Sequence, residues 1–424
     1  MRKAERTVLV GIVVAVALAI RLWYVLTAVV QHPLRADAGQ YAAYAKNLVD
    51  HGVFSLATTV PPPPDAFRSP GYPALLALCR AFAGEQSWLL VVAVVQAVLG
   101  AATVLLVYRI ARAWLPFAAA LGAALLTAFS PHLVVGSAYV LTECATTFCV
   151  ALAAWAFVGA DSRSRLALAA LAAGAGVLCN EALVVLPFAF GFAAWRTGKG
   201  RAVAYVLVAL LPLGVWSLRN QVQPLAKTGS ERATASISHG SYPGMVFRDV
   251  RYLGFPYRED PEQPAFGASW AGLREVLGRR VAAEPLRYAS WYLLEKPLWL
   301  WRWPLVQGND VYVYEVANSP YETQPVLGAT HGVMRCLHVP LMAAAAMAAL
   351  VALLRPRTAP VPLRALAAAV VAATLAYLPV IPDPRYLQPV RPLLFVLAAA
   401  GIAAAFAWCQ RRCRPVPAAV PSPS

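Results

Sequence analysis

Ten stretches of apolar residues constrain the fold of this chain more than any other feature. They cover about residues 7–30, 88–108, 114–130, 138–160, 165–180, 182–195, 202–218, 333–354, 364–381 and 390–408. A helix needs ~20 apolar residues to cross the ~30 Å hydrocarbon core of a bilayer. The pattern predicts an all-α polytopic membrane protein with about ten transmembrane helices. The fifth and sixth runs are short, so they form either a tight helical hairpin or one broken helix.

The composition agrees with this prediction and argues against nucleic acid as a partner. Hydrophobic residues make up 60% of the chain and charged residues 13%, whereas soluble domains are nearer half and a quarter. The net charge of +16 is explained by basic cytoplasmic loops, so we expect no nucleic-acid partner. The seven cysteines show no CxxC or Cys/His spacing. We therefore predict no disulfide framework, no metal site and no cofactor.

The distribution of basic residues at the ends of the apolar runs predicts the topology. With the N-terminus in the cytoplasm, Lys and Arg gather at the cytoplasmic ends, and the short outer turns at 131–137 and near Asn180 have none. This is the positive-inside pattern. We therefore predict a multi-pass protein of the cell (inner) membrane, in contact with membrane lipids and with both termini in the cytoplasm.

This topology divides the chain into regions. We expect an N-terminal transmembrane region at 1–218 with a first outer loop at 31–87, an extracytoplasmic loop region at 219–331, C-terminal transmembrane helices at 332–414 and a disordered tail at 415–424. In the first outer loop, Ala74 to Phe82 is apolar but too short to span, so we expect an interfacial helix. In the second outer region, Gly229 to Gly244 is predicted to be a loop.

Asp37 lies just beyond the first apolar run, and the residues after it have helical spacing. Tyr41, Tyr44 or Ala45, and Leu48 follow at intervals of three and four, which places them on one face of a short helix. A carboxylate at this surface can accept a proton from an acceptor hydroxyl. The alternative is that Asp37 is the N-cap of a helix that starts at Ala38.

Two further acids occur close to apolar runs. Glu143 lies at the outer end of the fourth run, where an intramembrane carboxylate is a candidate functional group. Its alternative is a structural acid paired with an arginine of the first outer loop. Glu181 follows Asn180 in a two-residue polar turn, where solvation alone explains an acid.

Three basic residues are expected at the outer surface beside Pro-rich or aromatic segments. They are Arg68 before Pro70-Gly71-Tyr72-Pro73, Lys296 before Pro297, and Arg385 in Pro382-Asp383-Pro384-Arg385-Tyr386. Cations in such places can hold a phosphate, and arginine can do so with two parallel hydrogen bonds. The alternative is ordinary snorkelling of long basic side chains to the membrane surface.

Six short motifs in a fixed order resemble a known family. They are Asp37-x3-Tyr41-x3-Ala45-x2-Leu48, Arg68-x-Pro70-Gly71-Tyr72-Pro73, Leu141-Thr142-Glu143, Trp216-x2-Arg219-Asn220, Glu284-Pro285 through Lys296, and Arg385-Tyr386-x2-Pro389-x2-Pro392. Together with the topology they resemble the membrane glycosyltransferases of family 39 type, which include protein O-mannosyltransferases and the aminoarabinose transferase that modifies lipid A. The resemblance covers nearly the whole chain.

This resemblance implies a C-type glycosyltransferase fold and transfer of a hexose or pentose from a polyprenyl-phosphate donor on the outer face. It implies that Asp37 is the catalytic base and Glu143 a second catalytic acid. The donor phosphate would be bound by Arg68, Lys296 and Arg385. The substrate pocket would include Tyr41, Tyr72, Arg219 and Tyr386.

One departure from the family bears on metal dependence. Many relatives have a second acid immediately after the first, whereas Ala38 follows Asp37 here, so no metal is implied in the first loop. In-line attack on C1 of the sugar, opposite the departing phosphate, predicts inversion. The acceptor is left open: a glycan, a lipid or a protein.

Two other functions fit the same helices and charges. A transporter or flippase of a lipid-linked sugar would share them, although it would more often show two matched halves, and no internal repeat is evident. A non-catalytic scaffold that anchors an envelope complex through 219–331 is the third reading.

Overall fold

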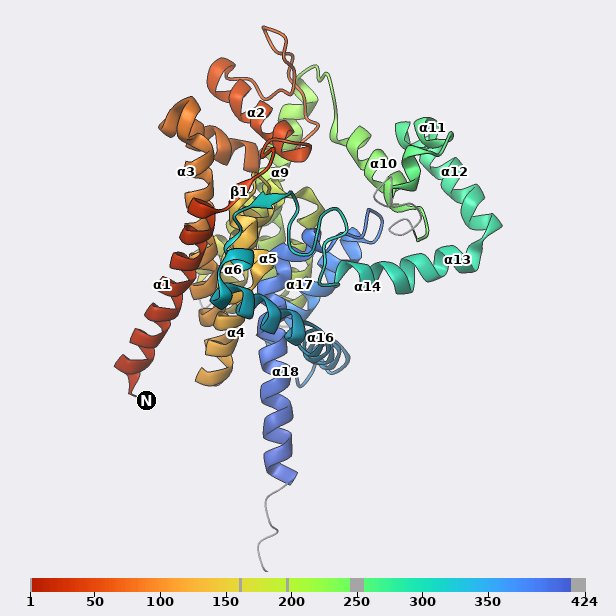
Figure 1. The fold of residues 1–424 in the computed structure, drawn as a ribbon. Helices are drawn as coiled ribbons and strands as arrows, with labels where there is room; N and C mark the ends of the chain where they lie inside the picture. Colours follow the sequence, from red (N-terminus) through yellow and green to blue (C-terminus); the bar gives the residue numbers. More distant parts are fainter. Residues whose placement is uncertain (1, 160–161, 196–197, 245–254, 413–424) are drawn as a thin grey trace, which may run out of the picture.

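The computed structural model describes residues 2–159, 162–195, 198–244 and 255–412, and it is almost entirely helical (Figure 1). The predicted all-α class is therefore confirmed. The predicted disordered tail at 415–424 lies outside the described residues.

Among the described residues, the N-terminal half forms ten α-helices and one short strand, and the longest connection is the loop 52–70 between α2 and α3. Their bounds are α1 Lys3–Thr27, β1 Val29–Val30, α2 Asp37–His51, α3 Gly71–Arg112, α4 Phe117–Phe129, α5 Pro131–Val135, α6 Glu143–Val158, α7 Arg163–Cys179, α8 Val185–Ala194, α9 Lys199–Val222 and α10 Gly229–Gly240. Short 3₁₀ turns at Gly136–Ala138 and Glu181–Val184 precede α6 and α8.

The C-terminal half begins with small helices and ends with three long ones. Their bounds are α11 Gln263–Ala268, α12 Trp270–Ala283, α13 Pro285–Ser290, α14 Lys296–Leu300, β2 Val316–Ala317, α15 Pro320–Thr323, α16 Pro325–Leu354, α17 Val361–Tyr377 and α18 Arg391–Arg412. A π-helical turn, Trp291–Glu295, joins α13 to α14. A 3₁₀ segment, Pro384–Val390, runs into α18.

Each of the ten apolar runs contains a helix, but the count of about ten transmembrane helices is not confirmed. Among the described residues, five helices are long and apolar enough to cross a membrane, or six if α4 and the segment Pro131–Ala138, bent by 53°, form one span. Glu143–Val158, Glu181–Ala194 and Val361–Tyr377 are shorter apolar helices. The chain is a multi-pass membrane protein.

The two ends of the helical bundle carry different parts of the chain. Figure 1 shows the start of α1 and the end of α18 at one end, while α2 lies at the other. Strands β1 and β2 pair antiparallel, with Val29 opposite Ala317 and Val30 opposite Val316. This pairing ties the segment after α1 to the segment before α16, close to α2.

The segment Ala74 to Phe82 belongs to a longer helix than the sequence indicated. It forms the first part of α3, which continues to Arg112 through a break at Gly84 with φ 68° and ψ 179°. Glycine accepts this positive φ without the steric cost that other residues incur. The break separates the short first part from the long apolar part, and the interfacial placement of the first part stays a prediction.

The prediction of a loop at Gly229–Gly244 is wrong, because most of this segment is the helix α10. Its small polar residues have low helix propensity, but its buried face packs on α11. Thr234 Oγ1 donates to the Gly267 carbonyl at 2.8 Å, and Gln263 Nε2 donates to Ser238 Oγ at 2.9 Å. Tertiary contacts therefore stabilise a helix that propensity alone does not favour. Figure 1 shows α10 to α14 extending to one side of the bundle.

Small residues let the long helices pack closely. A Cβ on Gly174 of α7 would lie 2.6 Å from the Ala209 carbonyl oxygen of α9, and a Cβ on Gly401 of α18 would lie 2.6 Å from the Ala344 carbonyl oxygen of α16. Close backbone approach through glycine and alanine is typical of membrane helices, where van der Waals contact replaces the hydrophobic effect.

We expect Gly401→Ala to destabilise the protein by about 1–3 kcal/mol, because the added methyl group meets backbone of α16 that cannot move freely. The measurement is thermal unfolding of the detergent-purified protein. Gly332→Ala is the matched control. Gly332 lies in α16, the helix that Gly401 of α18 packs against, and a Cβ at Gly332 has no neighbour within 4 Å. Equal melting temperatures for the two variants would contradict the close α16–α18 contact.

Candidate active site

Asp37 is the first residue of α2, and its carboxylate points away from the helix backbone. The N-cap is Ala36, and no side chain caps the helix, so the N-cap alternative for Asp37 is excluded. Instead, Asp37 Oδ1 lies 2.5 Å from Arg68 Nη2, and Oδ2 lies 3.3 Å from Arg385 Nη2. The carboxylate is therefore held between two guanidinium groups that come from distant parts of the chain.

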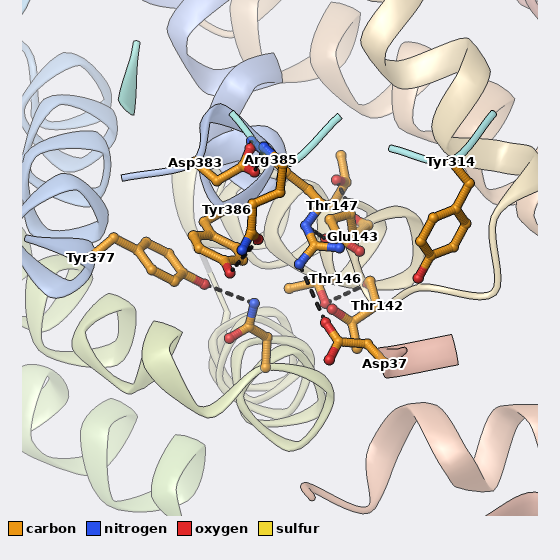
Figure 2. A network of polar contacts seen from close by, with 12 residues as sticks. Asp37, Thr142, Glu143, Thr146, Thr147, Tyr314, Tyr377, Asp383, Arg385 and Tyr386 are labelled. Atoms are coloured by element: carbon orange, nitrogen blue, oxygen red, sulfur yellow. Dashed lines mark hydrogen bonds and ion pairs between the residues drawn. The ribbon is translucent and has the colours of Figure 1, made fainter. Parts of the chain in front are cut away.

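Arg385 connects Asp37 to a second acid. It lies in the 3₁₀ segment before α18, where its backbone N–H donates to Asp383 Oδ1 at 2.9 Å. Its Nε lies 3.2 Å from Oε1 of Glu143, the first residue of α6. Figure 2 shows Arg385 between Asp37 and Glu143. One buried arginine therefore forms ion pairs with acids from two different helices.

Arg68 is fixed by three kinds of contact in the loop before α3. Its Nε donates to Gln40 Oε1 at 2.7 Å, its Nη2 binds Asp37, and its guanidinium lies 5.2 Å from the centre of the Tyr41 ring. Gln40 and Tyr41 follow Asp37 on α2. The first turn of α2 thus supplies an acid, an amide and an aromatic ring to the same arginine.

Burial and the neighbouring charges shift the pKa values of Asp37 and Tyr41, which both lie in α2. Burial by itself raises the pKa of Asp37, but the guanidiniums of Arg385 and Arg68 outweigh burial, so this pKa is lowered. Burial raises the pKa of Tyr41 to about 12, although Arg68 opposes the shift. At neutral pH Asp37 is therefore ionised and Tyr41 carries its proton.

The side chains differ in how far solvent reaches them. The Asp37 side chain is 33% exposed, whereas Arg68, Glu143 and Arg385 are 7–11% exposed. A molecule that approaches from outside can therefore meet the Asp37 carboxylate, while the residues behind it are held in the protein.

Tyrosines surround this group, but only some of them face it. The Tyr386 ring stacks on Tyr377 with ring centres 5.2 Å apart, next to the Arg385 guanidinium (Figure 2). Tyr72 is fully buried behind Tyr41, and its hydroxyl donates to Gln96 Oε1 at 3.1 Å. We therefore assign Tyr72 to the wall behind the site, because its hydroxyl is already used in the core.

The contacts of Lys296 differ from those that the sequence predicted. Lys296 is fully buried, and its Nζ donates to the carbonyls of Leu378, Pro379 and Val380 at the end of α17. These three bonds use all three donors of the ammonium group. Its predicted part in binding phosphate is therefore not supported by its contacts.

Arg219 supports the first outer loop. Its Nη1 donates to the Asp65 carbonyl at 2.9 Å, and its guanidinium lies 4.8 Å from the centre of the Trp216 ring. The structure does not bring Arg219 into contact with Asp37, and the prediction that it lines the substrate pocket does not fit these contacts.

Arg232 and Glu181 were not assigned to the site from the sequence, yet they lie beside it. Arg232 forms an ion pair with Glu181, and its Nε donates to the Phe67 carbonyl at 2.9 Å. Ser69 also donates to Glu181. Burial lowers the pKa of Arg232, and the positive charge of Arg68 adds to this effect. Arg232 escaped prediction because its segment was taken for a loop.

Residues from six separate segments of the chain thus form one polar group with alternating charges. Guanidiniums from Arg68, Arg232 and Arg385 are close to the carboxylates of Asp37, Glu143 and Glu181. Such a group can accept a proton and can bind an anion. Among the described residues, no three His, Cys, Asp or Glu side chains lie together in a way that would hold a metal ion.

Part of the sequence matches a known family model. A family model described as "Dolichyl-phosphate-mannose-protein mannosyltransferase" matches residues 67–217, which is less than half of the chain. The matched segment includes Arg68 and Glu143. No curated protein matches the chain.

Comparisons by structure match the whole chain to larger proteins. One is the archaeal oligosaccharyltransferase AglB from Archaeoglobus fulgidus, in complex with an inhibitory peptide and a dolichol-phosphate, with a TM-score of 0.54 and 14% identity over 100% of this chain and 52% of that one. Another is ArnT from Cupriavidus metallidurans in the apo state, with a TM-score of 0.50 and 14% identity over 96% of this chain and 62% of that one. This chain spans about half the length of the archaeal structure. The family match and the structural matches together show that this protein has the C-type glycosyltransferase fold that its sequence predicted.

Proposed function

We propose that this protein transfers a sugar from a polyprenyl-phosphate donor to an acceptor hydroxyl at the outer face of the cell (inner) membrane. The observation that carries the proposal is the partly exposed Asp37 carboxylate between the guanidiniums of Arg68 and Arg385. This arrangement puts a proton acceptor beside two anion-binding groups, and glycosyl transfer from a lipid phosphate needs both.

The comparisons support the donor class. The archaeal structure contains a dolichol-phosphate, and the family model is described by a dolichyl-phosphate sugar. Both are polyprenyl phosphates.

In the proposed reaction Asp37 takes the proton of the acceptor hydroxyl as its oxygen attacks C1 of the sugar. The new C1–O bond forms while the bond between C1 and the phosphate oxygen breaks, and the polyprenyl phosphate leaves with the electron pair. Attack opposite the leaving group inverts C1. A general base in this position contributes about 10²–10⁴-fold to the rate.

The arginines would stabilise the charge that develops on the leaving phosphate. Arg68 and Arg385 already contact the carboxylate, and Arg232 lies beside Arg68. Guanidinium groups bind phosphate through parallel charge-assisted hydrogen bonds, which act at a point where charge develops during the reaction. Lys296 is left out of this set because three carbonyls occupy its donors.

The ion pairs of Asp37 connect donor binding to catalysis. A carboxylate with a lowered pKa is ionised but is a weak base. A donor phosphate that competes for Arg68 and Arg385 would weaken their ion pairs with Asp37. The Asp37 carboxylate would then become a stronger base. We therefore propose that the base becomes strong only when the donor is bound.

The side of the membrane follows from the topology. The helix α2, which begins at Asp37, lies at the end of the bundle opposite the start of α1 and the end of α18 (Figure 1). With both termini in the cytoplasm, as the positive-inside pattern predicts, the site opens on the outer face.

We expect Asp37→Asn to lower turnover about 10²–10⁴-fold while the protein still folds and binds the donor, because the amide keeps the shape of the side chain but cannot accept the proton. The assay uses purified protein, radiolabelled polyprenyl-phosphate sugars and membrane extract, and follows label in the products. Asp50→Asn is the matched control, since Asp50 lies at the far end of α2 in an ion pair with Lys46. A flippase would move labelled lipid across vesicles without forming a glycosidic bond, and a scaffold would be indifferent to the substitution.

The lowered pKa of Asp37 predicts how stability depends on pH. Its folded-state pKa lies below the ordinary value of ~3.9. The ion pairs therefore stabilise the protein fully above the ordinary value, and this stabilisation is lost as the pH falls from there through the lower folded-state pKa. We expect the melting temperature of Asp37→Asn to lie below that of the wild type at pH 7, and this difference to shrink below about pH 5. A difference that grows on acidification would be the opposite of this result. Asp50→Asn, which removes a surface pair, should show little effect.

We expect transfer to be insensitive to chelator. Ala38 stands where many relatives have a second acid, and both Asp37 oxygens contact guanidiniums, which disfavours a bound cation there. The same transfer assay with and without chelator tests this expectation. Full loss of activity in chelator, with recovery on addition of a divalent metal, would overturn it.

A further inference from the structure

One side of the segment from α13 to α14 exposes a row of leucines. Leu286, Leu293, Leu294 and Leu298 are 64–85% exposed. They recur at intervals of seven, eight and four residues, which places them on one face of a helical segment. We call these four side chains the leucine face. Single exposed leucines are ordinary, but several on one face indicate a surface that contacts something apolar.

The opposite side of the same segment is buried in the protein. Tyr288, Trp291, Lys296 and Leu300 are at most 6% exposed. Trp291 Nε1 donates to the Gly240 carbonyl of α10 at 3.0 Å, and Lys296 Nζ donates to the carbonyls just after α17. These bonds fix the rotation of the segment about its axis, so the leucine face stays directed away from the protein.

The segment ends at a level inside the apolar part of the bundle. Trp301, the residue after α14, donates from Nε1 to Thr374 Oγ1, one turn before the end of α17, at 3.2 Å. Its carbonyl accepts a hydrogen bond from His338 Nε2 of α16 at 2.8 Å. His338 lies about 20 Å along the helix axis from Pro325, the first residue of α16. Trp301 is therefore bonded to α16 and α17 well below their ends on the side of α2.

At this level the surface of α16 is itself apolar. Val333, Leu337 and Val339 lie on either side of His338 and are 40–72% exposed. Since α16 is long and apolar enough to cross a membrane, these side chains are suited to contact with lipid acyl chains. Figure 1 shows α13 and α14 running outward from the bundle, across the direction of α18. A segment that leaves the bundle at this level and in this direction stays within the layer of lipids.

The charges of the segment leave the leucine face to an apolar occupant. Glu284 and Arg287 pair with each other at 2.7 Å at the far end of the segment. Glu295 is half-buried and accepts a hydrogen bond from Ser290 Oγ at 3.0 Å, and Lys296 is fully buried. The leucine face thus presents no free charge for a protein partner to recognise. Amphipathic helices that lie in a membrane surface bury such a face among acyl chains.

We propose that the segment 285–300 lies in the leaflet on the side of α2, parallel to the membrane surface, with the leucine face among lipid acyl chains. This leaflet is the outer one in the predicted topology. Part of the region 219–331, expected from the sequence to be extracytoplasmic, is then embedded in the membrane. The bond from Trp291 to α10 also attaches the helices α10 to α12 to that leaflet. The inference concerns contact with lipid, so it does not depend on the proposed glycosyl transfer.

Spin labels at single cysteines test this contact. Leu294→Cys and Leu298→Cys are made in a protein that carries Cys336→Ser and Cys409→Ser, because those two thiols are exposed, and Cys413→Ser, whose position lies outside the described residues. The full chain is reconstituted in vesicles of phosphatidylcholine and phosphatidylglycerol. Relaxation of the label by oxygen, which concentrates in hydrocarbon, is compared with relaxation by a water-soluble nickel chelate. The signal of the parent protein without a new cysteine is subtracted.

Two control positions define the scale of the measurement. Met347→Cys reports a lipid-facing site, because Met347 is 61% exposed on α16. Glu275→Cys reports a water-facing site, because Glu275 is an exposed acid on α12. We expect oxygen to relax the labels at Leu294 and Leu298 more than the nickel chelate does, as at Met347. The label at Glu275 should show the reverse order.

Two other results would overturn the inference. Labels at Leu294 and Leu298 that respond to the nickel chelate as the label at Glu275 does would place the leucine face in water. Labels shielded from both agents would show that a protein partner or a second copy of the chain covers it. The melting temperature of each variant is compared with that of the parent, and Leu293→Cys, on the same face, replaces any variant that does not fold. A protein that transfers no sugar would refute the proposed function and leave this test unaffected.

Discussion

The candidate site depends on the two ion pairs that Arg385 forms with Asp37 and Glu143. A buried guanidinium is costly in a low-dielectric interior unless carboxylates lie close to it. Asp37 and Glu143 meet this need, and they come from α2 and α6, while Arg385 itself precedes α18. The three segments must therefore stay together if none of the charges is to be left unpaired.

The helices around this group provide the rigidity that such pairing requires. Glycines and alanines let α7 pack on α9 and α16 on α18 at close range, while the β1–β2 pair ties the start of the first outer loop to the segment before α16. At the back of the site, Tyr72 and Gln96 fix the start of α3 in the core. The partly exposed Asp37 carboxylate is thus held by residues that are themselves buried.

The sequence named the four residues at the centre of the candidate site, but it did not predict the residues around them. Asp37, Arg68, Glu143 and Arg385 were all named from the sequence, and the structure brings them together. Lys296 and Arg219 were named as well, but carbonyls after α17 use all three donors of Lys296, and Arg219 binds the Asp65 carbonyl, which a motif does not reveal. Arg232 was missed, because a helix rich in serine and glycine has no propensity signal, and only its packing on α11 forms it.

The sequence by itself determined the fold class. Long runs of apolar residues are stable in a bilayer as helices, because a helix forms all of its backbone hydrogen bonds internally. Its charge pattern also predicted which ends face the same side. Only the tertiary structure decided which charges meet. Asp37 and Arg385 are far apart in the chain, and the direction of a side chain across such a separation depends on how the helices pack, which no local pattern encodes.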